Sequence, residues 1–273
     1  MNKKTICGIT GHTGSIGKHF VETTKKFKFV RFKGDITKKN SVDNWIKKNK
    51  FDLIIHLAAI VPIKNVNRNK RRALEVNTLG TRNLVNSIIK NKSKIGWFFL
   101  ASTSHVYSSQ KKKIKENFKV NPLTYYGKTK YLAEREVIKL SKMKMNYCIG
   151  RIFSTTNINQ RTNYFIPDIK KKIKNSKKKL ILSNLNHYRD FISISDISKI
   201  IFVLWEKKFK GILNIATGKS RRLDFLAKII AKKYKKKIII KKQNQPTYLI
   251  ANNKLLKKIY KKKINTNIKK MIF

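Results

Sequence analysis

The chain has 273 residues, 41% of them hydrophobic, so it is long enough to bury a globular core as one domain or one and a half. Its 66 Lys and Arg residues against 13 Asp and Glu give a formal charge of +53, but they are spread through every segment, which indicates a bias of the whole chain rather than a nucleic-acid site. No apolar run reaches the roughly 18 residues of a membrane span, no signal peptide follows the basic start, and no His or Cys residues have metal-ligand spacing, so we expect a cytoplasmic protein without a metal.

A glycine-rich loop near the N-terminus is the first feature along the chain. Residues 5–9 are apolar and suit a strand, and four of the 11 glycines in the sequence fall within residues 8–17. An amphipathic run follows at once, which predicts a strand, a tight loop and a helix. Gly11, Gly14 and Gly17 would let the backbone approach a pyrophosphate, and the first N–H groups of the helix would face its negative charge. We predict a dinucleotide site here, with an ordinary strand-to-helix turn as the alternative.

A second strand is expected over residues 27–32, where apolar side chains alternate. It leads to Asp35, and an acidic residue at about this distance from the glycines often binds the adenosine end of a dinucleotide. Asp35 is therefore a candidate for that role, and a turn or helix-capping aspartate is the alternative. Arg31 and Lys33 would instead suit the 2′-phosphate of NADP.

A short helix and a buried strand come next. Residues 41–48 have the spacing of an amphipathic helix with Ser41 as its N-cap. Residues 51–59 form a continuous apolar run, which suits a central parallel strand covered by helices on both faces. The small side chains of Ala58 and Ala59 at its carboxyl end would leave room for a cofactor in the crevice where such sheets bind ligands.

Hydroxyl side chains mark the end of the following strand. A long helical pattern over residues 68–91 precedes a buried strand over residues 95–100, which runs into Ser102, Thr103 and Ser104. Since parallel strands present their carboxyl ends to the same crevice, these hydroxyl groups are expected near the predicted dinucleotide site.

A tyrosine and a lysine share one face of the next predicted helix, over residues 124–140. Tyr126 and Lys130 lie four residues apart. A lysine beside a tyrosine favours the phenolate and would lower the phenol pKa from its usual value near 10 toward working pH, as proton transfer at a carbonyl requires. Tyr107 and Lys111 have the same spacing, but Tyr126 follows a proline turn and the hydroxyl cluster. Tyr126 is the candidate acid/base, and a surface tyrosine is the alternative.

Five motifs together resemble the extended short-chain dehydrogenase/reductase family, and within it the NAD-dependent epimerase/dehydratase branch that acts on nucleotide sugars. They are Thr10-Gly11-His12-Thr13-Gly14-Ser15-Ile16-Gly17, His56-Leu57-Ala58-Ala59, Asn77-Thr78-Leu79-Gly80-Thr81, Ser102-Thr103-Ser104-His105-Val106-Tyr107 and Tyr126-Gly127-Lys128-Thr129-Lys130. The resemblance implies an α/β fold, a Rossmann-type doubly wound parallel sheet with a smaller C-terminal α/β substrate-binding region. We expect the NAD(P)-binding domain over residues 1–153 plus roughly 187–207, and the substrate-binding region over residues 154–186 and 208–273.

The resemblance also implies a role for individual residues. Tyr126 would be the acid/base, Lys130 would lower its pKa and hold the nicotinamide ribose, and Thr103 would hydrogen-bond the reacting oxygen of the sugar. Arg189 would bind the diphosphate of the substrate, for which its permanent charge and bidentate geometry are suited; an ion pair with Asp190 or another acid is the alternative. The residues implied to bind NAD or NADP are Gly11, Gly14, Ser15, Ile16, Gly17, Asp35, Ile36, Leu57, Ala58, Ala59, Asn77, Tyr126 and Lys130.

The resemblance leaves the reaction open. Family dehydratases carry an acidic pair directly after the Thr, whereas this chain has Ser104 and His105, so 4,6-dehydration is disfavoured. C4 epimerisation and reduction of a 4-keto sugar both fit. The expected partner is a nucleotide-sugar substrate, and the resemblance is also compatible with a homodimer. The alternative from another class is a non-catalytic protein of dinucleotide-binding fold that binds RNA or a protein partner through its basic surface.

Overall fold

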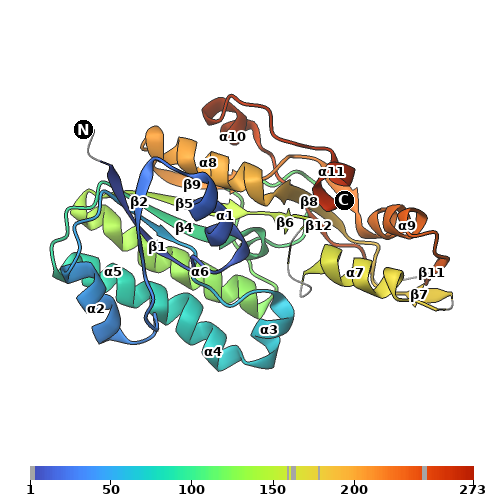
Figure 1. The fold of residues 1–273 in the computed structure, drawn as a ribbon, viewed down its shortest axis with the longest axis horizontal. Coiled ribbons are helices and arrows are strands. Elements are labelled where there is room, and N and C mark those ends of the chain that lie inside the picture. The colour runs from blue at the N-terminus through green and yellow to red at the C-terminus, as the bar shows by residue number, and fades with distance from the viewer. Residues whose placement is uncertain (1–3, 159, 161–163, 178, 242–244) are drawn as a thin grey trace.

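The computed structural model describes residues 4–158, 160, 164–177, 179–241 and 245–273, and a six-stranded sheet forms its larger part (Figure 1). All neighbouring strands of this sheet are parallel. The strand order is β2 (Phe27–Arg31), β1 (Thr5–Thr10), β3 (Leu53–His56), β4 (Trp97–Thr103), β5 (Asn146–Ile152) and β9 (Gly211–Ile215). The Rossmann-type parallel sheet expected from the sequence is therefore confirmed.

Helices cover both faces of the large sheet (Figure 1). Helices α1 (Ser15–Thr23) and α8 (Ile194–Glu206) lie on one face, and α2 (Lys39–Lys47), α5 (Gly80–Lys90) and α6 (Tyr125–Ile138) lie on the other. Alternate residues of one strand serve the two cores: Leu53 and Ile55 of β3 pack with α1 and α8, whereas Ile54 packs with α2 and α5. This alternation explains why the strand is apolar throughout. Both cysteines are free and buried, as their apolar surroundings in the sequence predict.

Two predicted helices differ from the sequence-based expectation. Helix α2 begins at Lys39 with Lys38 as its N-cap, so Ser41 is not the cap and lies inside the first turn. The Ser41 hydroxyl instead packs closely on Gly34, where an added Cβ would lie 2.0 Å from it. The helix expected over residues 68–91 is present over residues 70–90, but a π-helical turn (Glu75–Leu79) lies between α4 (Lys70–Leu74) and α5, and a separate short helix, α3 (Ile63–Arg68), precedes it.

The smaller region lies at one end of the large sheet (Figure 1). Its main sheet contains β6 (Ser154–Thr156), β8 (Tyr188–Ser193), β10 (Ser220–Arg222) and β12 (Tyr248–Leu249), and a second sheet pairs β7 (Leu180–Leu182) with β11 (Ile238–Ile240). Its helices are α7 (Phe165–Lys174), α9 (Leu223–Lys233) and α11 (Ile268–Ile272), whereas α10 (Lys254–Ile259) packs through Leu256 on the core shared by α8 and β9 of the large sheet. Apolar side chains of α7, α9 and α11 form a separate core.

The sheets divide the chain differently from the expected domain boundaries. Strand β9 was expected in the substrate-binding region, but it joins the large sheet beside β5, with Leu213 opposite Gly150 and Ile215 opposite Ile152. Conversely, β8 was expected in the NAD(P)-binding domain, but it belongs to the smaller sheet. The chain crosses between the two regions more than once, which brings residues of both to one cavity. Every helix in the described part of the chain is too short or too polar to span a bilayer.

Candidate active site

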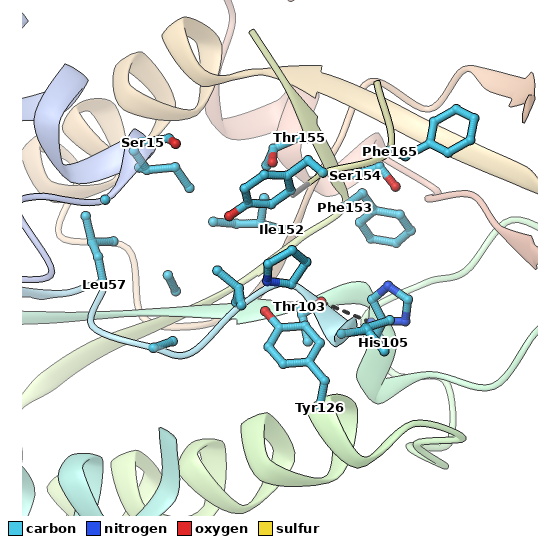
Figure 2. A pocket seen from close by; sticks show the side chains of 18 of the residues that line it. Ser15, Leu57, Thr103, His105, Tyr126, Ile152, Phe153, Ser154, Thr155 and Phe165 are labelled. Atoms are coloured by element: carbon cyan, nitrogen blue, oxygen red, sulfur yellow. Dashed lines mark hydrogen bonds between the residues drawn. The ribbon is translucent and has the colours of Figure 1, made fainter. Parts of the chain in front are cut away.

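A cavity of about 750 Å³ opens where the carboxyl ends of β1, β3, β4 and β5 face the smaller region (Figure 2). Eleven of the residues predicted to form the site line it: Gly11, Gly14, Ser15, Ile16, Gly17, Leu57, Ala58, Ala59, Thr103, Tyr126 and Arg189. In Figure 2, Ser15 and Leu57 lie on the far side of the cavity from His105 and Phe165. The cavity therefore joins the predicted dinucleotide loop to the predicted catalytic residues.

The glycine loop leaves no space for side chains at two of its positions. Gly11 has φ +70°, and a Cβ there would lie 2.5 Å from the Ala58 nitrogen; a Cβ on Gly17 would lie 2.3 Å from the Gly11 carbonyl oxygen. Gly14 is the N-cap of α1, and no side chain among the described residues caps this end by a hydrogen bond. The first N–H groups of the helix, from Ser15 onward, are therefore free to bind a pyrophosphate. These residues fit a dinucleotide.

The wall of the cavity at residues 57–60 is held by a buried histidine. The Ala58 N–H donates to the Thr10 hydroxyl at 3.2 Å. The same hydroxyl lies 2.6 Å from Nδ1 of His56, and Nε2 of His56 lies 2.9 Å from the Thr81 hydroxyl. Burial lowers the pKa of His56 to about 3, so the ring is neutral. Because Thr81 donates its own proton to a backbone oxygen, Nε2 donates to Thr81 and Nδ1 accepts from Thr10.

Asn77 supports the same wall from behind. Its Oδ1 accepts the Ile60 N–H at 2.7 Å, and its Nδ2 donates to Oγ1 of Thr129 on α6 at 3.1 Å. Asn77 is fully buried and does not line the cavity. In this structure it acts on the predicted cofactor site by fixing residue 60.

Thr103 and Tyr126 meet inside the cavity. Thr103 ends β4, and Tyr126 lies in the first turn of α6, where the two side chains lie beside each other (Figure 2). The Thr103 hydroxyl accepts the His105 N–H at 3.2 Å. The Thr124 hydroxyl caps α6 by accepting the Gly127 N–H at 3.0 Å. A Cβ on Gly127 would lie 2.0 Å from the His105 carbonyl oxygen, so this glycine lets the helix approach the end of β4. Ser102, Thr103 and Tyr126 thus line one cavity, and their catalytic roles stay predictions.

Burial sets the protonation of Tyr126. It raises the pKa of the phenol, the neighbouring Tyr164 raises it further, and the Thr103 hydrogen bond opposes both. The direction is the reverse of that expected from the Tyr126 and Lys130 spacing, because the effect of burial on the phenol outweighs the others. Lys130 is only 2% exposed and does not line the cavity, and burial lowers its pKa to about 8.

Arg189 projects into the cavity from the smaller sheet without a carboxylate partner among the described residues. Its Nη1 donates to the carbonyl oxygens of Tyr188 and Thr247 at 2.8 and 3.0 Å, and its Nη2 donates to the Thr247 hydroxyl at 2.9 Å. Asp190 instead accepts hydrogen bonds from Thr217 and Gly218. The alternative of an ion pair with Asp190 is therefore wrong. Burial lowers the Arg189 pKa to about 10, as expected for a cation enclosed by protein.

Asp35 lies outside the cavity lining. One of its carboxylate oxygens accepts the Thr37 N–H and hydroxyl at 2.9 and 2.8 Å, and the other accepts from Arg72 at 3.0 Å. These bonds lower its pKa to about 2. The structure thus contains the turn aspartate that was the alternative, while a ribose contact stays a prediction. Ile36 is buried against Gly80 and also lies outside the lining.

Further lining residues were not singled out from the sequence. His105 packs edge-to-face on Tyr126 with ring centroids 5.9 Å apart, and burial and the charge of Arg189 lower its pKa to about 4. Residues 152–155 lie at and just after the carboxyl end of β5. Position at a strand end is the signal that identified Thr103, and the same signal could have identified these residues. Tyr164 and Phe165 reach the cavity from the smaller region, and no local pattern indicates that contact.

Comparisons with known proteins agree with this geometry. The model of the "NAD dependent epimerase/dehydratase family" matches residues 7–216. The GDP-6-deoxy-D-talose 4-dehydrogenase of Aggregatibacter actinomycetemcomitans is 31% identical over 77% of this chain and 74% of its own length. The UDP-glucose 4-epimerase of Mycoplasma genitalium is 25% identical over 93% of this chain and 83% of its own. The solved structure of RMD from Pseudomonas aeruginosa complexed with NADPH covers 98% of this chain and 96% of its own, with TM-score 0.88 and 18% identity, and shows the same fold.

Proposed function

Because the chain belongs to the NAD dependent epimerase/dehydratase family, it is an enzyme that uses NAD or NADP, and we propose that it reduces a nucleotide-activated 4-keto sugar at C4. One observation carries the proposal. Tyr126 and Thr103 line the same cavity as the glycine loop and Arg189. A proton donor, a dinucleotide loop and a cation for a diphosphate are the groups that this reaction needs.

Each of these groups has a distinct task. The glycine loop and the N-terminus of α1 would hold the dinucleotide, which when bound supplies or accepts the hydride at C4. As C4 of a keto sugar is reduced, the Tyr126 hydroxyl gives its proton to the carbonyl oxygen, which becomes a hydroxyl group. Thr103 orients that oxygen. Burial keeps Tyr126 protonated, and the protonated phenol is the form that reduction requires.

The absence of acidic side chains disfavours dehydration. Among the described residues that line the cavity there is neither Asp nor Glu. Ser104 is buried and His105 is held neutral, so neither replaces an acidic pair as the acid and base that remove water. The hydroxyl and imidazole groups present can bind the hydroxyls of a sugar.

C4 epimerisation is the second candidate, favoured by the alignment of the Mycoplasma genitalium 4-epimerase over 93% of this chain. Purified protein incubated with NADH or NADPH and a panel of nucleotide 4-keto sugars separates the two. Loss of the nicotinamide absorbance in step with product supports reduction. C4-epimerised product from a nucleotide hexose, with no net change in cofactor, supports epimerisation.

The same experiment can contradict both reactions. Absence of turnover with every sugar, together with salt-sensitive RNA binding, would support the non-catalytic alternative, which membership of an enzyme family disfavours. Comparing the two cofactors also tests the role of Arg31 and Lys33. Burial and then the charges of Arg31 and Lys33 lower the pKa of His12 in the glycine loop, and a preference for NADPH would support their predicted role.

Replacing Arg189 with Ala should raise KM for the nucleotide sugar about tenfold or more and change kcat less, because a charged hydrogen-bonding group that binds a diphosphate contributes about 1.5–3 kcal/mol. The matched control is Arg221→Ala. Arg221 lies opposite Arg189 on β10, but it donates to the backbone of Ser220 and Thr266 and does not line the cavity. Initial rates over a range of substrate concentrations measure both constants. An unchanged KM in Arg189→Ala would contradict the assignment.

A further inference from the structure

A buried carboxylate lies one helical turn behind Lys130. Tyr126, Lys130 and Glu134 follow one another at intervals of four on α6 and so share one face of the helix. The Glu134 side chain is only 1% exposed. It accepts hydrogen bonds from Nε and Nη2 of Arg151 on β5 at 3.0 and 2.7 Å, and from the Ser102 hydroxyl on β4 at 2.5 Å.

We propose that Glu134 is a positioning residue of the reaction: its carboxylate holds the Lys130 ammonium in the charged form and ties α6 to the strand that carries Thr103. The inference rests on the proposed function, since it assigns a task to a residue that acts through Lys130 and Thr103. Ser102 directly precedes Thr103, so the hydrogen bond from Ser102 to Glu134 fixes the end of β4 against the helix that carries Tyr126.

The charges around Lys130 make Glu134 the group that opposes its deprotonation. Burial lowers the pKa of Lys130 to about 8, and Glu134 acts in the opposite direction. Among the described residues, His56 on β3 lies close enough for the lysine charge to lower its own pKa, and Tyr126 precedes Lys130 by four residues on α6. Both are uncharged, so neither stabilises an ammonium as a carboxylate does.

The pair that Glu134 forms with Arg151 is better explained by positioning than by stability. A buried ion pair usually stabilises a protein no more than apolar residues of the same size, because both charges lose their hydration. Here Arg151 also donates to the Tyr107 hydroxyl at 2.8 Å, and Tyr107 donates to Oδ1 of Asn214 on β9 at 2.9 Å. The network thus joins α6, β4, β5 and β9 directly behind the catalytic residues.

The test is the pH dependence of kcat/KM in the full-length Glu134→Gln variant, measured with the substrate and cofactor that the wild-type enzyme turns over. Removing the carboxylate takes away the charge that opposes deprotonation of Lys130, so the neutral lysine is favoured. If Lys130 must be charged, activity falls as pH rises through its pKa, and this alkaline limb should move to lower pH by about one unit or more in the variant. At a pH below both limbs the rates should converge.

The matched control is Glu136→Gln. Glu136 is on the same helix with a side chain 7% exposed, and it pairs with Arg82 and Lys139 rather than facing Lys130. Loss of the Glu136 carboxylate should lower the thermal stability and leave the alkaline limb of the pH profile at the wild-type pH. Equal shifts in the two variants would overturn the proposal, because they would reflect loosening of the helix and not the charge at residue 134.

A double variant keeps the test decisive if Glu134→Gln folds poorly with Arg151 left unpaired. Glu134→Gln combined with Arg151→Met removes both buried charges, and circular dichroism reports whether it folds. The alkaline limb should again move to lower pH, and a wild-type limb in either folded variant would overturn the proposal. Full turnover in Tyr126→Phe would instead refute the proposed function, so the two failures are distinguishable.

A second readout needs no turnover. Lys130 binds fewer protons in the folded than in the unfolded chain between about pH 8 and its ordinary value of 10.5, so it makes the unfolding free energy rise with pH in that window. Subtracting the pH dependence of Lys130→Met isolates this contribution from the other lysines. In Glu134→Gln the pH range over which Lys130 makes the unfolding free energy rise should begin at lower pH. An unchanged range would contradict the inference.

Discussion

Tyr126→Phe should lower kcat by about 10²- to 10⁴-fold, the range that a positioned general acid or base contributes. The variant removes a single oxygen, and with it the proton that the proposed reduction gives to the sugar. The aromatic ring and its edge-to-face contact with His105 remain. The glycine loop lies on other elements, so affinity for NAD(P)H should stay close to wild type in a fluorescence titration.

The neighbouring tyrosine provides the control for this prediction. Tyr125 begins α6, its ring lies 5.8 Å from Nζ of Lys70, and it does not line the cavity. Tyr125→Phe therefore changes the same functional group at the same end of the same helix, and turnover should stay near that of the wild type. Comparable turnover in both variants would exclude Tyr126 as the acid/base.

The parallel sheet could be predicted because its pattern is local. The strand, glycine loop and helix at residues 5–23 follow from apolar runs and glycine spacing, and the apolar run around β3 reflects helices on both faces. Which sheet a later strand joins is not local. Strands β8 and β9 have similar apolar content, and only their pairing with β6 and β5 assigns them to different sheets. For this reason the expected boundaries differ from the sheet membership of these two strands.

The site was predictable to a similar degree. Thr103, Tyr126 and the glycine loop were found because each lies at a strand end or helix start, and parallel topology brings these positions together. The direction of the Tyr126 pKa depends on enclosure by residues such as Tyr164, which no spacing reveals. Asp35 stands at the expected distance from the glycines, yet Arg72, 37 residues further along the chain, occupies one of its oxygens.

Gly17→Ala should abolish most of the affinity for NAD(P)H. The added Cβ would lie 2.3 Å from the Gly11 carbonyl oxygen and 2.7 Å from Cα of His12. Both atoms belong to the backbone of the loop, so they can give way only if the loop opens and α1 moves from it. Overpacking of this kind costs about 1–3 kcal/mol, which corresponds to about a 5- to 150-fold loss of affinity if the whole cost falls on cofactor binding.

Gly14→Ala separates this steric effect from any general effect of adding a methyl group to the loop. A Cβ on Gly14 would lie 3.3 Å from the same Gly11 oxygen, a distance that a shift of a few tenths of an ångström relieves. Its φ is −73°, which alanine adopts freely. Cofactor titration should therefore rank wild type, Gly14→Ala and Gly17→Ala in order of falling affinity. Equal losses at both positions would mean that the close packing of Gly17 on Gly11 does not shape the dinucleotide site.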